Sequence, residues 1–188
     1  MADAMDGRAA AVLRFWFEES VPEDWFKKSD EFDARIRDRF LQVYEDAAAG
    51  RLDGWRESAA GCLALILVLD QFPRNLFRDS ARAFATDPAA RAATRHALER
   101  GFDTAAEIAA ERRIFFYMPL EHSEDIEDQR RCVELVGERL DSANYLDYAE
   151  KHLRVIERFG RFPHRNAVLG RENTAAEAAY LAEPGAGF

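Results

Sequence analysis

A short motif of phenylalanine, proline, arginine and asparagine occurs twice in the chain, and its polar residues are of the types that bind anions. Residues 71–78 read QFPRNLFR, and residues 161–171 read RFPHRNAVLGR. Arginine presents a planar fork of N–H groups that fits a carboxylate or a phosphate at two points. The motif therefore predicts two loops that contact an anion. Their candidate ligand-binding residues are Arg74, Asn75, Arg78, Arg161, Arg165 and Asn166.

Histidines with a carboxylate neighbour lie beside these motifs. Glu121 and His122 begin an acidic stretch, and His164 lies inside the second motif. Imidazole titrates near pH 7, so it can accept or donate a proton, and an adjacent carboxylate raises its basicity. Glu121, His122 and His164 are therefore the candidate catalytic residues. His152 is expected to be a packed histidine on the apolar face of a helix.

The same arginines can be explained without a ligand. An acidic stretch lies between the motifs, with carboxylates at Glu121, Glu124, Asp125, Glu127 and Asp128. They could pair with the arginines in a structural salt-bridge network, since such networks also concentrate charge. Both explanations stay open at this point. A metal site is not expected, because no HExxH or HxxxH spacing occurs, and no cofactor is expected, because GxGxxG and P-loop sequences are missing.

The segments that carry these residues have the periodicity of α-helices. Apolar residues recur at helical spacing after Ser29, and the run CLALILVLDQF, residues 62–72, is apolar on almost every side. That run predicts a central buried helix, since no second strand-like run could pair with it. Pro119 is expected to end a short aromatic helix. Phe72 and Phe162 are expected to leave helical geometry, because each precedes a proline.

Capping signals mark the remaining helices. Asp87 followed by a proline predicts the start of an alanine-rich helix, and Ser123 is expected to cap another. Thr174 and Glu177 form a capping box for the last helix. About seven or eight helices with short connections predict an all-α fold, in a single domain over residues 1–188.

Composition narrows the class of protein. The chain has 188 residues, of which 48% are hydrophobic and 32% charged, the balance of a folded soluble protein. A net charge of -9 disfavours binding to nucleic acid or to an anionic membrane. The acidic start MADAMDGRAA is unlike a secretion signal, no apolar run reaches the roughly 20 residues of a membrane span, and two cysteines are too few for a disulfide framework. We therefore expect a cytoplasmic protein.

Five segments of the chain are long and ordered enough to indicate a family. They read LRFWF (13–17), LDQFPRNLFR (69–78), AFATD (83–87), YMPLEHSED (117–125) and RFGRFPHRNAVLGR (158–171). Together they resemble the bacterial family called domain of unknown function 924, over residues 12 to about 181. The resemblance implies helix pairs stacked as in tetratricopeptide-repeat (TPR) proteins. It does not imply an activity or any catalytic residue.

Two classes of function are compatible with these residues. In the first, the two motifs meet around a pocket in which the arginines, with Glu121, His122 and His164, bind a small anionic metabolite or hydrolyse it by acid–base chemistry. In the second, the arginines hold an acidic peptide or partner protein in the groove of a TPR-like adaptor without catalysis. We favour the first, because the motifs concentrate side chains that do not serve packing.

Overall fold

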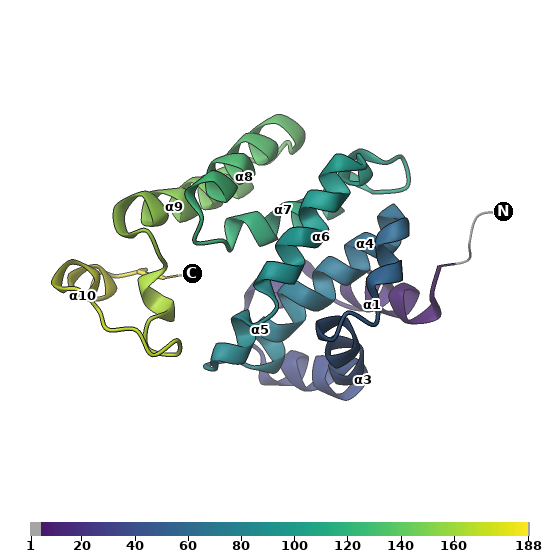
Figure 1. The fold of residues 1–188 in the computed structure, drawn as a ribbon, viewed down its shortest axis with the longest axis horizontal. Helices are drawn as coiled ribbons and strands as arrows, with labels where there is room; N and C mark the ends of the chain where they lie inside the picture. Colours follow the sequence, from purple (N-terminus) through teal and green to yellow (C-terminus); the bar gives the residue numbers. More distant parts are fainter. Residues whose placement is uncertain (1–4, 188) are drawn as a thin grey trace. The chain divides into compact units, whose positions relative to one another are not determined.

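Every regular element in residues 5–187, the part of the chain that the computed structural model describes, is a helix, so the all-α prediction is confirmed. The α-helices are α1 (Gly7–Phe17), α2 (Pro22–Phe26), α3 (Asp30–Ala48), α4 (Ala59–Ile66), α5 (Phe72–Leu76), α6 (Asp87–Glu99), α7 (Ile114–Glu121), α8 (Ile126–Arg139), α9 (Ala143–Phe159) and α10 (Ala175–Leu181) (Figure 1). The sequence predicts fewer helices because α2 and α5 have five residues each, too few to show a period. Within the described residues, none of the helices combines the length and apolar character that a membrane span requires.

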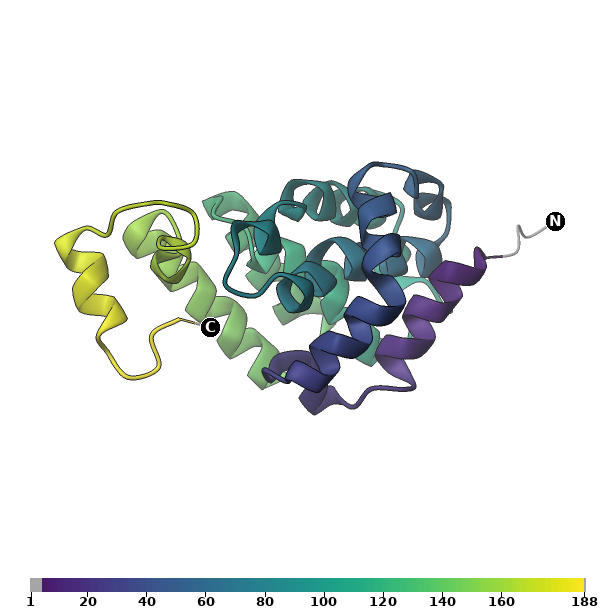
Figure 2. The same ribbon diagram turned by 90° about the horizontal axis from the view of Figure 1, so that it is seen from below.

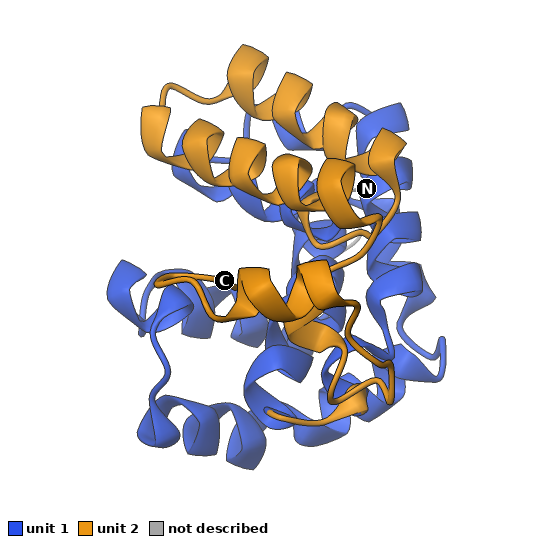
Figure 3. Cartoon of the chain, turned by 90° about the vertical axis from the view of Figure 1, so that its left-hand side faces the viewer, with its two compact units in different colours: residues 1–78, 82–119 blue, residues 79–81, 120–188 orange. Residues whose placement is uncertain are grey.

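The chain divides into two compact units, each of which is described by itself. The described part of unit 1 comprises residues 5–78 and 82–119, and that of unit 2 comprises residues 79–81 and 120–187 (Figure 3). The single domain and the TPR-like stacking of helix pairs both stay predictions.

Aromatic rings fill the core of unit 1. Phe15 of α1 is fully buried, and its ring centroid lies 5.5 Å from that of Phe32 and 5.1 Å from that of Phe40, both on α3. Figure 2 shows α1 and α3 side by side. The buried residues of α3 include Ile36 and Val43, at the spacing that the apolar period predicts.

The central apolar run is helical and buried on all sides, as predicted. It forms α4, continues through a π-helical turn at Leu67–Gln71, and ends in α5. Every residue of Gly61–Pro73 is buried. The carboxylate of Asp70 is among these buried groups. Burying a charge costs free energy unless the charge is paired, so we expect specific partners to hold this carboxylate in place.

A proline in this helix explains the π-helical turn. Pro73 has no N–H to donate to the carbonyl of Leu69, four residues earlier. The hydroxyl of Thr86 donates to that carbonyl instead, at 2.6 Å. The wider π-helical turn accommodates the proline ring, so the helix continues through Pro73. Phe72 keeps helical backbone angles, with φ -59° and ψ -43°. The prediction that Phe72 leaves helical geometry is therefore wrong.

Two other helix ends differ from the sequence prediction. Pro119 lies inside α7, which continues to Glu121, so the prediction that this proline ends the helix is wrong. The cap of α8 is Asp125, and not Ser123, whose hydroxyl donates to the carboxylate of Asp128 at 2.8 Å.

The caps at the other predicted sites are closer to expectation. α6 begins at Asp87, but the carboxylate does not cap the helix, because it binds the side chain of Arg74. Phe162 is extended as predicted, with φ -88° and ψ 107°. Thr174 and Glu177 form the predicted capping box of α10.

Unit 2 is built on the helical hairpin of α8 and α9, which pack along their length. Its apolar core contains Val155 and Ile156 of α9 together with Phe162, and Phe159 and Tyr180 pack against them. The core therefore anchors the second Phe-Pro motif to the end of α9.

The substitution Thr86→Val tests the role of the Thr86 hydroxyl, which donates to the carbonyl of Leu69 at the π-helical turn. Valine keeps the shape of threonine but leaves the buried carbonyl of Leu69 without a donor, so the free energy of unfolding should fall by about 1–3 kcal/mol. Urea denaturation followed by circular dichroism measures this loss. Thr104→Val removes an exposed hydroxyl and should change stability by no more than about 0.5 kcal/mol. Equal stabilities of the two variants would contradict our account of the π-helical turn.

Candidate functional site

The first motif places Arg74 in a set of buried bonds within unit 1. Its guanidinium donates twice to the carboxylate of Asp87, at 3.0 and 3.2 Å, and once to the backbone carbonyl of Asp70, at 2.6 Å. The side-chain carboxylate of Asp70 lies 3.3 Å away. The positive charge of Arg74 is therefore compensated by acids of unit 1.

The same holds for the other polar residues of the first motif. Arg78 forms a two-point ion pair with Asp33 of α3. The side-chain amide of Asn75 donates to the same carboxylate at 2.8 Å. Asp33 and Asp87, which compensate these arginines, lie outside the acidic stretch 121–128 that the sequence offered as partners.

In the second motif, Arg161 binds α10. Its guanidinium donates to both carboxylate oxygens of Glu177, at 2.6 and 2.9 Å, and to the backbone carbonyl of Glu172 at 2.9 Å. The bonds from Arg161 hold the pKa of Glu177 well below its usual range, and the N–H of Thr174 adds to the effect.

A second ion pair closes the loop of this motif. Arg171 donates to both oxygens of Glu124, at 2.7 and 2.9 Å, and to the side-chain carbonyl of Asn166 at 2.8 Å. Burial alone would raise the pKa of Glu124, but the bonds from Arg171 and from the backbone of Phe162 hold that pKa below its ordinary value. The amide of Asn166 in turn donates to Asn173 at 2.7 Å. Arg171 and Glu124 thus form one of the pairs that the salt-bridge explanation expects.

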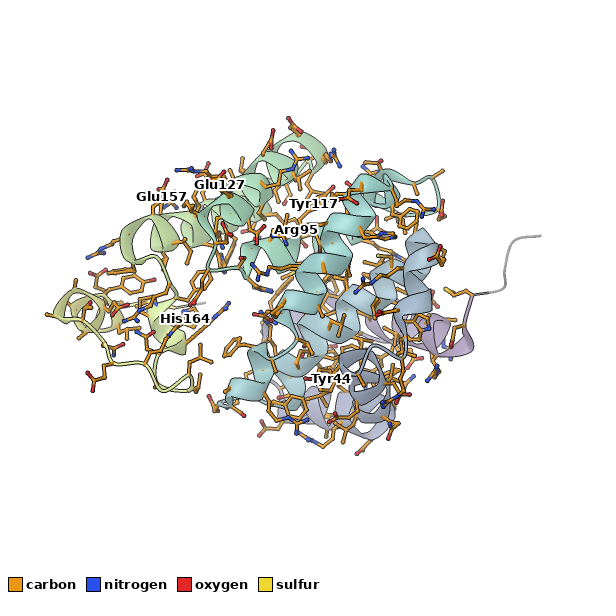
Figure 4. The ribbon with its side chains drawn as sticks, viewed as in Figure 1. Tyr44, Arg95, Tyr117, Glu127, Glu157 and His164 are labelled. Atoms are coloured by element: carbon orange, nitrogen blue, oxygen red, sulfur yellow. The ribbon has the colours of Figure 1, made fainter. Side chains whose placement is uncertain are left out.

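Three histidines of unit 2 gather near the ring of Phe162. The ring centroids of His152 and His164 lie 5.6 and 5.5 Å from that of Phe162, and those of His122 and His152 lie 6.4 Å apart. Arg165 places its guanidinium carbon 4.4 Å from the centroid of Phe162 and donates to the carbonyl of His122 at 2.9 Å. We call these five residues the histidine cluster. His164, labelled in Figure 4, comes from the turn Pro163–Arg165 that follows α9.

Burial keeps two of these imidazoles neutral. Burial lowers the pKa of His152 to about 3 and that of His164 to about 4, and the positive charge of Arg165 contributes to both shifts. Nδ1 of His152 lies 2.9 Å from the carbonyl of Tyr148, which can only accept, so this nitrogen carries the proton and Nε2 is left as an acceptor. The carboxylate of Glu121 is 3.6 Å from the same Nδ1.

The structure thus brings part of the predicted site together within unit 2. Glu121, His122, His164 and Arg165 meet at the histidine cluster, while Arg161 and Asn166 are bonded to other parts of the same unit. Arg74, Asn75 and Arg78 belong to unit 1, so a pocket shared by both motifs stays a prediction.

His152 belongs to the cluster, although sequence reasoning set it aside. It is buried on α9, as expected of a packed histidine, but it also touches Phe162 of the motif. No sequence signal separates it from an ordinary packed histidine, because its contact with Phe162 depends on the fold of the loop after α9. In residues 5–187, no group of three or more histidine, cysteine, aspartate or glutamate side chains has an arrangement that could hold a metal ion.

Comparison with known proteins places the chain among proteins of unknown function. The model of a family described as a bacterial protein of unknown function (DUF924) matches residues 12–185. A solved structure of ATU0120 from Agrobacterium tumefaciens, titled a protein of unknown function, is 46% identical, with a TM-score of 0.87. The match covers 93% of this chain and 96% of that one. A search of curated proteins found no match.

The neutral buried histidines make stability depend on pH. An unfolded histidine has a pKa of about 6.5, so between that value and the folded value of about 3 for His152 the unfolded state binds more protons. The free energy of unfolding should therefore fall as the pH decreases from 7.5 to 5.5.

The variant His152→Gln keeps an N–H for Tyr148 and removes one titrating group. Its stability should depend less on pH, by up to about 1.4 kcal/mol per pH unit at the lower end of the range. Urea denaturation at several pH values between 7.5 and 5.5 measures both slopes. Parallel slopes for the wild type and the variant would show that His152 is not held neutral in the folded state.

Proposed function

The chain belongs to the bacterial family DUF924, whose function is unknown. From the residues of unit 2, we propose that this unit binds a small anionic metabolite at the histidine cluster. The observation that carries the proposal is a buried guanidinium, that of Arg165, among three imidazoles.

Electrostatics at the cluster favour a negative ligand. Besides burial, the permanent positive charge of Arg165 lowers the pKa of His152. A positive potential that opposes protonation of an imidazole attracts an anion for the same reason, and low solvent exposure strengthens both effects.

The neutral imidazoles add donors and acceptors around such an anion. Each has one N–H that can donate to an oxygen and one nitrogen that can accept a proton. An anion bound beside His164 would offset the charge of Arg165 and raise the pKa of the imidazole towards the range in which it transfers protons. His122, His164 and Glu121 are therefore the groups that we propose for acid–base chemistry on a bound metabolite.

A thermal-shift screen with orthophosphate, pyrophosphate, citrate and succinate tests the proposal. At about one hundred times its Kd, a ligand specific for the folded state adds roughly 2.7 kcal/mol to stability, which gives a clear rise in Tm. We expect at least one of these anions to stabilise the wild type and to lose its effect in Arg165→Ala.

Two further variants make this test specific. Arg154→Ala removes an exposed arginine of α9 that pairs with Glu150, so it lowers the overall charge equally and should keep the shift. His164→Asn leaves every arginine in place and should weaken the shift. If no anion stabilises the wild type, or if the shift survives in both Arg165→Ala and His164→Asn, the histidine cluster is not an anion site. A larger shift with an acidic peptide than with any metabolite would favour the adaptor function.

A further inference from the structure

Unit 1 contains a cleft that the histidine cluster does not use. It lies between one face of α3 and the end of α5, and its volume is about 350 Å³. Pockets for small molecules have volumes of roughly 300–1,000 Å³, so the cleft is large enough for a ligand of modest size.

The hollow arises from a small residue among long ones. Asp30, Ala34, Arg37 and Asp38 lie at the helical spacing that puts them on one face of α3. Ala34 has only a methyl group, and the charged side chains before and after it form the two ends of the cleft. Because a helix rises about 1.5 Å per residue, the Cα atoms of Asp30 and Asp38 are about 12 Å apart.

The floor of the cleft is held by bonds within unit 1. Asp33 is fixed by Asn75 and Arg78, and the guanidinium of Arg37 donates to the backbone carbonyl of Leu76. These groups shape the cleft and have their charges or polar atoms engaged.

The two ends of the cleft carry charges that are not engaged. In the part of the chain that the structure describes, the side chains of Lys28, Asp30 and Asp38 take part in no ion pair or hydrogen bond. At one end Lys28 offers an ammonium group. At the other end Asp38 offers a carboxylate beside Arg37, whose guanidinium is already bonded to Leu76.

We propose that this cleft binds a short zwitterionic peptide of three residues with small uncharged side chains. Its C-terminal carboxylate binds Lys28, its N-terminal ammonium binds Asp38, and its middle lies over Ala34 and Leu76. An extended chain spans up to about 3.5 Å per residue, so three residues cover about 10.5 Å of the roughly 12 Å between the two ends, and the contacts with Lys28 and Asp38 span the rest. The ionisable residues lining the cleft are three of each sign, which matches a ligand without net charge.

Titration calorimetry with trialanine on the full chain tests this proposal, with two analogues that each lack one terminal charge. N-acetyl-trialanine lacks the ammonium group, and trialanine amide lacks the carboxylate. We expect trialanine to bind, and each analogue to bind about tenfold more weakly, because each loses one charge-assisted contact. No saturable binding of trialanine up to about 10 mM, or equal binding of all three compounds, would overturn the proposal.

Matched variants locate the ligand. Lys28→Gln should weaken trialanine about tenfold and leave trialanine amide unaffected, since the amide has no carboxylate for Lys28 to bind. Lys27→Gln, which changes the neighbouring exposed lysine outside the cleft, should leave binding unchanged. Ala34→Leu fills the hollow on an exposed helix face and should abolish binding without changing the Tm. Retention of binding in Ala34→Leu would overturn the placement.

This proposal is independent of the anion site in unit 2. Arg165→Ala should abolish the anion-induced shift and leave the affinity for trialanine unchanged, so failure of one proposal is distinguishable from failure of the other. Loss of trialanine binding in a folded Arg165→Ala protein would overturn the assignment to the cleft in unit 1.

Discussion

The cost of partly burying a guanidinium determines how both Phe-Pro motifs are held. A partly buried cation loses some of its hydration, and a carboxylate with further acceptors compensates for that loss. The chain provides this compensation with acids drawn from distant segments: Arg74 with Asp87, Arg78 with Asp33, Arg161 with Glu177, and Arg171 with Glu124. Each pair joins a motif to a helix or to the turn beside it. Arginines that the sequence suggested as ligand-binding residues therefore stabilise the loops of each unit.

The two copies of the motif reach this result through different backbones. In the first copy, Pro73 lies in a continuous helix, and Thr86 supplies the donor that the proline lacks. In the second copy, Pro163 follows an extended Phe162 and begins a short turn. The second arrangement places Arg165 against aromatic rings, where it lowers the pKa of neighbouring histidines. Similar sequence thus leads to a structural bond network in unit 1 and to the candidate anion site in unit 2.

Sequence reasoning succeeds where the determinants are local. The apolar period of α3 and the capping box at Thr174 depend on residues within a few positions of each other, and both are found as predicted. The helical geometry of Phe72 depends on Thr86, fourteen residues later, which no local rule includes.

For the candidate site, the sequence identifies the residue types but not their partners. Arg78 is recognisable as an anion-binding residue, yet its anion is Asp33, 45 positions away. His152 was missed because the period of α9 marks it only as a core residue, whereas its contact with Phe162 depends on the fold of the loop. No sequence motif indicates the cleft beside Ala34, because the cleft results from the small size of the alanine side chain among longer neighbours.

The π-helical turn at Leu67–Gln71 also sets the phase of everything that follows it. Its extra residue rotates the later part of the helix by about 100° relative to a regular α-helix. That rotation sets the direction in which Arg74, in α5, leaves the helix. Removing one residue from the turn would rotate the guanidinium group of Arg74 by the same angle, away from the carboxylate of Asp87 that now receives it. The irregular turn therefore directs the charge of Arg74 towards its partner.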